Sequence, residues 1–434
     1  MKHTLTLALL VSASSLQAQE SATANMPNTT TSPEWGVGIG FRSATIPFQT
    51  GDDTVHDVLP LLFYQGENFY LDGFSGGYKF GLSDNVSAGP IAQIRFFDIP
   101  RNAQNTIQGT QLDVGGNMTW HYSDSVDFKF DVLSDHDGRV YSLLTSEYKL
   151  SGEDWSSSMY ASLRAKSSRF NNTYYGLQTE DLGAQIDYQI GFKGRKQIYQ
   201  NLYAVGHLGA TIYDHETYSS QYMDSHGQLE SYLGIAMFGS ANTWQQPEIP
   251  KGAYMRVAHG IATQSGPFDI FLFNNETDPH RNSMTSVFYG HPLNGTVFNL
   301  PIDFYLTPGY VQHHSSDVQG TFGEYVMAIK GYYTFNWPIR SRLGFAEGVS
   351  YSTQISHIER ESVGKHDYEP SKLMNYLDFS YDVNLGDVFN NSSIKDLWLG
   401  YSLHHRSGIF TSTSAFGRIK GGSDYNSIYL QWHF

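Results

Sequence analysis

The chain has 434 residues, no cysteine and a formal net charge of −15 at neutral pH. The lack of cysteine excludes disulfides, thiolate metal sites and a cysteine nucleophile. The negative charge argues against nucleic acid as a partner, since phosphate binding needs clustered Lys and Arg, and no basic stripe is visible.

The first 18 residues predict a secretory signal peptide. Lys2 and His3 precede an apolar run that is too short to span a bilayer, and Ala18 is a small residue at the expected cleavage point. Residues 19–34 follow as a flexible lead-in. No later apolar run approaches the roughly 18 residues of a transmembrane helix. We therefore expect an exported protein without membrane-spanning helices.

Strand-like alternation begins at Trp35 and recurs along the chain. The runs 202–213, 297–306 and 324–333 each place apolar side chains at every second position. In the last of these runs Glu324 and Lys330 lie opposite the apolar face. Charged side chains on the inner face and apolar ones on the outer face are typical of a membrane barrel, because a soluble sandwich has an apolar inner face.

The segment 240–252, "SANTWQQPEIPKG", contains two prolines and no alternation, and it predicts a linker. It separates residues 35–239 from residues 253–434. The predicted fold class is therefore all-β, with two transmembrane antiparallel β-barrels of the bacterial outer membrane in tandem. One large barrel is the alternative, since about 10 residues per strand plus turns fits either arrangement.

The final run, "SDYNSIYLQWHF", alternates up to Phe434. A terminal aromatic residue that closes an alternating strand resembles the signal by which outer-membrane barrels are recognised for insertion. We therefore expect the protein in the cell outer membrane.

Residues 35–239 resemble the MipA/OmpV family of outer-membrane proteins. The resemblance is carried by "EWGVGIGFRSATIPFQTGDD", "VLPLLFYQGENFYLDGFSGGYKFGL", "NNTYYGL" and "YLGIAMFG". It implies a barrel without catalytic chemistry, and as one function a scaffold for periplasmic cell-wall (murein) enzymes. A pore is a further non-enzymatic alternative.

Residues 253–434 resemble the PagL-type lipid A 3-O-deacylases. His405 and Ser407 match the family's His-x-Ser motif, and Asp424 stands where the family has an acid, usually Glu. Gly408 replaces the Asn that commonly follows the family's serine, and the next loop is longer. The resemblance implies ester hydrolysis on lipid A or a related outer-leaflet lipid. Ser407 would be the nucleophile, His405 the general base and Asp424 the orienting carboxylate, with no metal or organic cofactor.

The pleat of the strands gives an independent prediction for the same three residues. Side chains two apart share a face, so His405 and Ser407 project to the lipid side with Leu403, and Asp424 does so with Ile428. Their two strands are joined by one loop, which predicts a hydroxyl, a base and a carboxylate at one rim of the wall. The alternative is that these polar residues only end the apolar band at headgroup level.

Two other parts of the sequence, Glu347 and the run at 313–317, carry ionisable side chains outside the predicted site. Glu347 shares the face of Leu343 and Phe345, and we expect a β-bulge that turns it inward rather than a role in the site. The run "HHSSD" at 313–317 could hold a metal, but without a third ligand at a fixed spacing it favours a loop.

Overall fold

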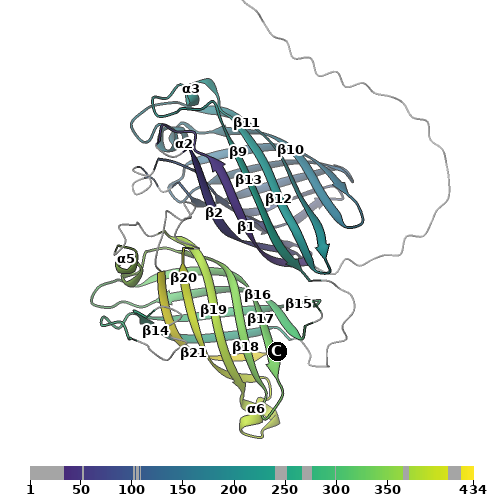
Figure 1. Cartoon of the computed structure of the whole chain (residues 1–434), viewed down its shortest axis with the longest axis vertical. Coiled ribbons are helices and arrows are strands. Elements are labelled where there is room, and N and C mark those ends of the chain that lie inside the picture. Colours follow the sequence, from purple (N-terminus) through teal and green to yellow (C-terminus); the bar gives the residue numbers. More distant parts are fainter. Residues whose placement is uncertain are drawn as a thin grey trace, which may run out of the picture. The chain divides into compact units, whose positions relative to one another are not determined.

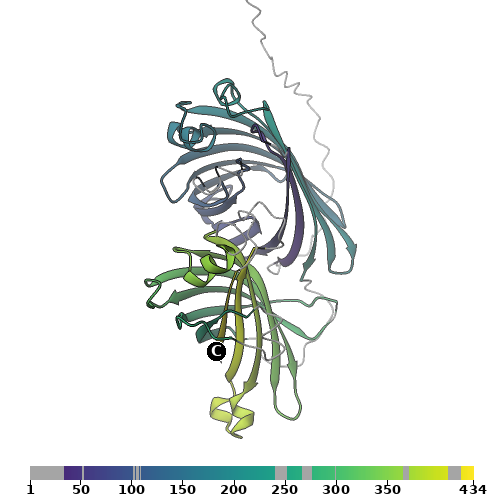
Figure 2. The same ribbon diagram turned by 60° about the vertical axis from the view of Figure 1, so that its left-hand side comes forward.

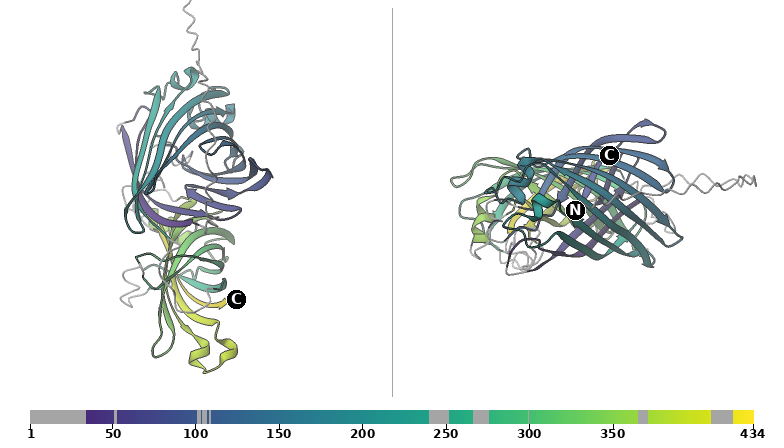
Figure 3. Two further views of the ribbon diagram at one scale, coloured as in Figure 1. Left: turned by 90° about the vertical axis from the view of Figure 1, so that its right-hand side faces the viewer. Right: turned by 90° about the horizontal axis from the view of Figure 1, so that it is seen from above.

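The computed structural model describes residues 34–50, 53–100, 103, 107, 109–239, 252–265, 276–298, 300–364, 371–408 and 422–434. These residues form two separate closed rings of antiparallel strands (Figures 1 and 2). Further views show the slant of the strands, which closure of a sheet into a barrel requires (Figure 3). No helix in the described ranges is long and apolar enough to cross a membrane.

The first barrel closes through the order β4-β3-β2-β1-β13-β12-β11-β10-β9-β8-β7-β6-β5, with β4 also paired to β6. β4 and β5 follow each other along β6, so they share one place in a 12-strand ring. Two short helices, α2 Ser168–Tyr174 and α3 His215–Tyr218, lie in loops at one rim. The strands are β1 Glu34–Thr45, β2 Thr54–Gln65, β3 Phe69–Gly73, β4 Ser75–Tyr78, β5 Phe80–Ser83, β6 Val86–Arg95, β7 Gln111–Ser123, β8 Val126–Ser134, β9 Val140–Ser151, β10 Trp155–Lys166, β11 Gln185–Tyr199, β12 Leu202–Ile212 and β13 Gly227–Phe238.

The second barrel closes in simple chain order from β14 to β21, and β21 pairs back onto β14. Helix α5 (His357–Gly364) lies between β18 and β19, and α6 (Leu385–Val388) and the 3₁₀ helix η1 (Ser392–Ile394) lie between β19 and β20. The strands are β14 Tyr254–Thr263, β15 Ser283–Leu293, β16 Ile302–His313, β17 Phe322–Phe335, β18 Ser341–Ser352, β19 Leu373–Asn384, β20 Leu397–Ser407 and β21 Gly422–His433.

Two tandem barrels are therefore confirmed, and the alternative of one large barrel is wrong. The first ring ends at Phe238 and the second begins at Tyr254. The expected signal peptide and all of the lead-in except Glu34 lie outside the described residues. The expected linker does so too, apart from Gly252.

The second barrel is filled by charged and hydrogen-bonded side chains together with an apolar cluster that includes Met284, Phe288 and Val326. The carboxylate of Asp378 accepts hydrogen bonds from Lys330 and, at 2.8 Å, from Arg256. Arg342 binds Asp382 through two nitrogens at 2.8 and 2.7 Å. All five side chains are buried, whereas apolar and aromatic side chains on the strands of this barrel are exposed, among them Tyr325, Leu343, Phe345, Leu399, Ile428 and Trp432.

The first barrel has the same organisation. Met118 and Leu208 are exposed on the outside, while Asp113 and Asp187 are buried inside. Polar-inside and apolar-outside alternation is therefore confirmed for both rings.

Two local expectations are wrong. The strand expected over 297–306 begins only at Ile302, because Phe298 has a φ of +52°, which extended backbone does not allow. No bulge turns Glu347 inward. Strand β18 keeps an unbroken register with both neighbours, so Glu347 stays on the outer face and is half-buried there.

Candidate functional site

The described structure brings the three predicted site residues into one hydrogen-bonded chain. The Nδ1 atom of His405 lies 2.6 Å from Oδ1 of Asp424. Its Nε2 atom lies 2.8 Å from Oγ of Ser407. A carboxylate that holds one imidazole nitrogen while the other accepts a serine proton is the arrangement of serine hydrolases. The geometry can therefore support attack on a carbonyl carbon by the Ser407 hydroxyl.

Strand register produces this geometry. His405 on β20 pairs directly with Asp424 on β21, and Ser407 lies two residues further along β20 on the same face. Directly paired residues have Cβ atoms about 4.5–5.5 Å apart, so an imidazole and a carboxylate meet across the strands. The side chains of His405 and Asp424 are 13% and 11% exposed. Both side chains are therefore mostly buried, but a part of each remains exposed.

The outward direction of the site follows the expected parity. Below His405 on β20, Leu399 and Tyr401 are exposed, and below Asp424 on β21, Ile428 and Leu430 are exposed. The triad thus continues the apolar outer stripe of the barrel at its rim.

The alternate residues of β20 face the lumen and form a separate cluster. His404 Nε2 lies 3.1 Å from Glu324, which also binds His313 at 2.8 Å. Arg406 donates at 2.7 Å to Glu359 of helix α5. These contacts on the lumen side hold the end of β20 in place, and with it the outward-facing side chains of His405 and Ser407.

The buried Glu359 carboxyl lies in a loop helix, outside the strands. Burial raises its pKa to about 7, although the charge of Arg406 acts in the opposite direction and that of Glu324 adds to the rise. The attachment of α5 to the barrel wall therefore depends on a group that titrates near neutrality.

The "HHSSD" run divides between strand and loop. His313 ends β16 and binds Glu324 in the lumen, while His314 bonds the Thr285 hydroxyl at 2.9 Å. Within the described part of the chain, no three His, Cys, Asp or Glu side chains gather in a way that could hold a metal ion.

The first barrel carries a different polar interior. A cavity of about 460 Å³ is lined by charged side chains, with Lys193 reaching Asp72 at 3.4 Å and Glu147 at 3.2 Å. His207 faces the same lumen and lies 2.9 Å from the Tyr160 hydroxyl. These ion pairs and hydrogen bonds join side chains of different strands, so the interior of the first barrel is hydrophilic.

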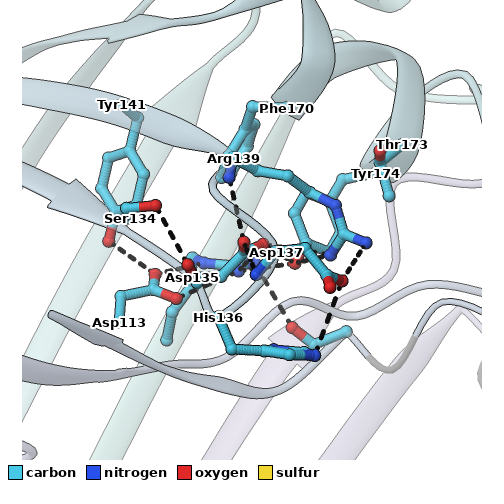
Figure 4. Close-up of polar contacts among 12 residues, drawn as sticks. Asp113, Ser134, Asp135, His136, Asp137, Arg139, Tyr141, Phe170, Thr173 and Tyr174 are labelled. Atoms are coloured by element: carbon cyan, nitrogen blue, oxygen red, sulfur yellow. Dashed lines mark hydrogen bonds and ion pairs between the residues drawn. The ribbon is translucent and has the colours of Figure 1, made fainter.

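At the rim that carries α2, the turn between β8 and β9 is organised by Asp135 (Figure 4). Its carboxylate accepts hydrogen bonds from the backbone N–H groups of Asp137 and Arg139, both at 3.0 Å, and from the Tyr174 hydroxyl at 2.6 Å. Burial alone would raise the pKa of Asp135, but these hydrogen bonds and the charges of Arg139 and Arg95 outweigh it and hold the pKa below its usual range. This cluster ties the rim loops together.

One residue beside the triad was missed from the sequence. Asn375 of β19 pairs directly with Ser407 and lies on the same outer face. The signal in the sequence was a polar residue on the lipid-facing parity of "LMNYLDF". Only the pairing of β19 with β20 places it next to the nucleophile.

Two rings with charged interiors and a continuous apolar outer surface define an outer-membrane β-barrel protein. Residues 36–237 match the family model of the MltA-interacting protein MipA. The family match thus covers the first barrel and not the second. No curated protein matches the chain.

Several solved outer-membrane proteins are similar to the chain at low identity. OccK11 (OpdR) of Pseudomonas aeruginosa is 11% identical with a TM-score of 0.26, over 92% of this chain and 95% of that one. The channel DcaP of Acinetobacter baumannii is 10% identical with a TM-score of 0.23, over 94% and 99%. The translocator domain of NalP from Neisseria meningitidis is 9% identical with a TM-score of 0.16, over 94% and 90%.

Proposed function

We propose that the second barrel is an esterase that removes an ester-linked acyl chain from lipid A or a related outer-leaflet lipid. The observation that carries the proposal is the continuous hydrogen-bonded chain Asp424–His405–Ser407, with contacts of 2.6 and 2.8 Å on the outer face. The resemblance of this half to the PagL-type deacylases adds to it.

The reaction follows from the atoms present. The Ser407 Oγ attacks the ester carbonyl carbon while His405 Nε2 takes the hydroxyl proton, and Asp424 stabilises the imidazolium that forms. His405 returns the proton to the departing sugar oxygen, which leaves an acyl chain on Ser407. Water, deprotonated by the same imidazole, then releases the fatty acid. This sequence uses no metal or organic cofactor.

The surroundings of the triad suit a lipid substrate. The strand ends that flank the three longest connections of the second barrel, 264–282, 353–372 and 408–421, all lie at the rim that carries the site. Long connections of outer-membrane barrels lie outside the cell, which supports a position at the outer leaflet. The exposed Tyr401 and Ile428 lie below the triad, where an acyl chain would run.

A second, non-enzymatic function is favoured for the first barrel by its MipA-family match. Members of that family are named for interaction with MltA, and by analogy the first barrel would serve as a scaffold for periplasmic murein enzymes. The charged cavity of about 460 Å³ is the feature that would favour a pore instead.

Mass spectrometry of lipid A from cells that express the wild type, Ser407→Ala or Ser393→Ala tests the esterase. We expect loss of one acyl chain with the wild type and with the control Ser393→Ala, which lies at the opposite rim, and intact lipid A with Ser407→Ala. Lipid A that is unchanged by a folded wild-type protein would overturn the esterase and favour the scaffold.

His405→Ala and His404→Ala form a matched pair for the direction of the site. The first removes the base, and the second removes a neighbouring imidazole that points into the lumen. We expect deacylation to be abolished by the first and to stay within a few-fold of wild type in the second.

A further inference from the structure

We propose that the side-chain amide of Asn375 forms the oxyanion hole of this site by donating a hydrogen bond to the substrate oxygen. The proposal rests on the esterase function proposed above and adds a catalytic residue to it. It identifies the residue that would stabilise the tetrahedral intermediate after attack by Ser407.

Strand pairing places Asn375 beside the nucleophile. Asn375 on β19 pairs with Ser407 on β20, and His405 on β20 pairs with Asp424 on β21. All four side chains lie on the outer face. The acid and the base therefore face each other across β21 and β20, and the nucleophile and the amide face each other across β20 and β19, two residues nearer the rim. The amide is thus beside the nucleophile, on the strand that does not carry the acid.

The side-chain amide of Asn375 is buried with an unpaired oxygen. Asn375 is only 4% exposed, yet its Oδ1 atom has no hydrogen-bond partner. Buried polar atoms are normally paired, and leaving one unpaired is costly. The Asn375 amide beside Ser407 therefore has hydrogen-bonding capacity that no other group in the described part of the protein satisfies. Rotation of the amide by half a turn exchanges its oxygen and its NH₂ group, so the same side chain can present a donor.

The residue that follows the nucleophile is a glycine. Gly408 has no side chain, so the position after Ser407 offers no side-chain amide that could donate to the oxyanion. A donor for the oxyanion must therefore come from a backbone N–H group or from a neighbouring strand. Asn375 is the side chain that the register places directly opposite Ser407.

The expected chemical effect is specific to the transition state. Attack by Ser407 turns the neutral carbonyl oxygen into an anion, and a preorganised N–H donor stabilises the anion far more than the carbonyl. Loss of one such donor typically lowers kcat by about 10²–10³-fold. We therefore expect Asn375→Ala to lower kcat by that amount and to leave KM nearly unchanged.

The test uses the purified full chain in lipid A vesicles, with a long-chain p-nitrophenyl ester as a second substrate. Asn375→Ala, Asn375→Asp and Ser407→Ala are compared with the control Asn426→Ala. Asn426 is another outward asparagine, and the Tyr401 hydroxyl hydrogen-bonds to it. Asn375→Asp keeps the volume of the side chain but presents a negative group, so we expect at least the same loss as for Asn375→Ala. A heat-dependent gel shift shows that each barrel has folded.

A second readout does not depend on turnover. A fluorophosphonate reacts when the Ser407 oxygen displaces fluoride from phosphorus, with the proton passing to His405, and its phosphoryl oxygen then lies where the oxyanion would. We expect labelling of the Asn375 variants to slow by at least ten-fold, and labelling of Asn426→Ala to match wild type.

The outcomes separate the two proposals. A folded Asn375→Asp or Asn375→Ala protein with kcat within five-fold of wild type, alongside an inactive Ser407→Ala, overturns the oxyanion hole and leaves the esterase standing. Full activity of Ser407→Ala overturns the esterase, and the role of Asn375 falls with it.

Discussion

Replacing Asp424 by Asn tests the triad through the protonation state of one ring. A neutral imidazole carries one proton, and the 2.6 Å contact with Asp424 keeps that proton on Nδ1 of His405. Nε2 is then free to accept the Ser407 proton across 2.8 Å. An amide at position 424 can donate its own N–H to Nδ1, which moves the ring proton to Nε2 and removes the base.

The expected loss of kcat is large because either orientation of the new amide impairs the base. If the amide donates, the wrong tautomer forms, and if its oxygen accepts, no negative charge stabilises the imidazolium. Loss of the orienting carboxylate from a serine hydrolase lowers kcat by about 10⁴-fold, or about 5 kcal/mol of transition-state stabilisation. We expect Asp424→Asn to approach this value, and Asp424→Glu to keep part of the activity.

The assay measures release of fatty acid from lipid A vesicles by the purified full chain. Asp387→Asn is the matched control, because Asp387 binds Arg340 in the connection at the opposite rim. Each variant must show the heat-dependent gel shift of a folded barrel. If Asp424→Asn stays within ten-fold of wild type while Ser407→Ala is inactive, Asp424 does not hold the imidazole, and the reasoning is refuted.

Three further predictions concern stability, pH and topology. Asp378→Asn should lower the free energy of unfolding in urea by about 3–5 kcal/mol, because it leaves two buried cations, Arg256 and Lys330, without their carboxylate. The control Asp387→Asn, which removes a partly exposed ion pair, should lower it by at most about 1 kcal/mol. Equal losses in the two variants would contradict a charged core. The pKa of Glu359 is raised in the folded state, so the folded state binds the proton more tightly, and attachment of α5 should weaken as pH rises from about 4.5 to about 7, seen as faster amide hydrogen exchange. Glu359→Gln should remove this trend, and its persistence would exclude Glu359 as the cause. A cysteine at Asp317 should be labelled on intact cells and one at Ser393 only after permeabilisation, and the reverse would invert the proposed orientation.

The sequence by itself determined the class of fold and the faces of the strands. A period of two with charged residues on one side can satisfy both a lipid environment and a polar lumen only in a closed barrel. The same period placed His405, Ser407 and Asp424 on the outer face, because parity is a local property of the pleat. These features needed no knowledge of which strands are neighbours.

Strand pairing and register were decided only by the tertiary structure. Closure at β21–β14 and at β13–β1 makes two rings, and nothing local in the alternation tells where one ring closes. Register decides that Asn375 of the preceding strand, rather than another of its outward residues, lies opposite Ser407. Glu347 was wrongly expected to turn inward because alternation alone does not show whether a strand is regular, and the unbroken pairing of β18 keeps its carboxylate outside. The lumen contacts among Arg256, Lys330 and Asp378 likewise form across the ring, since side chains from separate strands meet only once the barrel has closed.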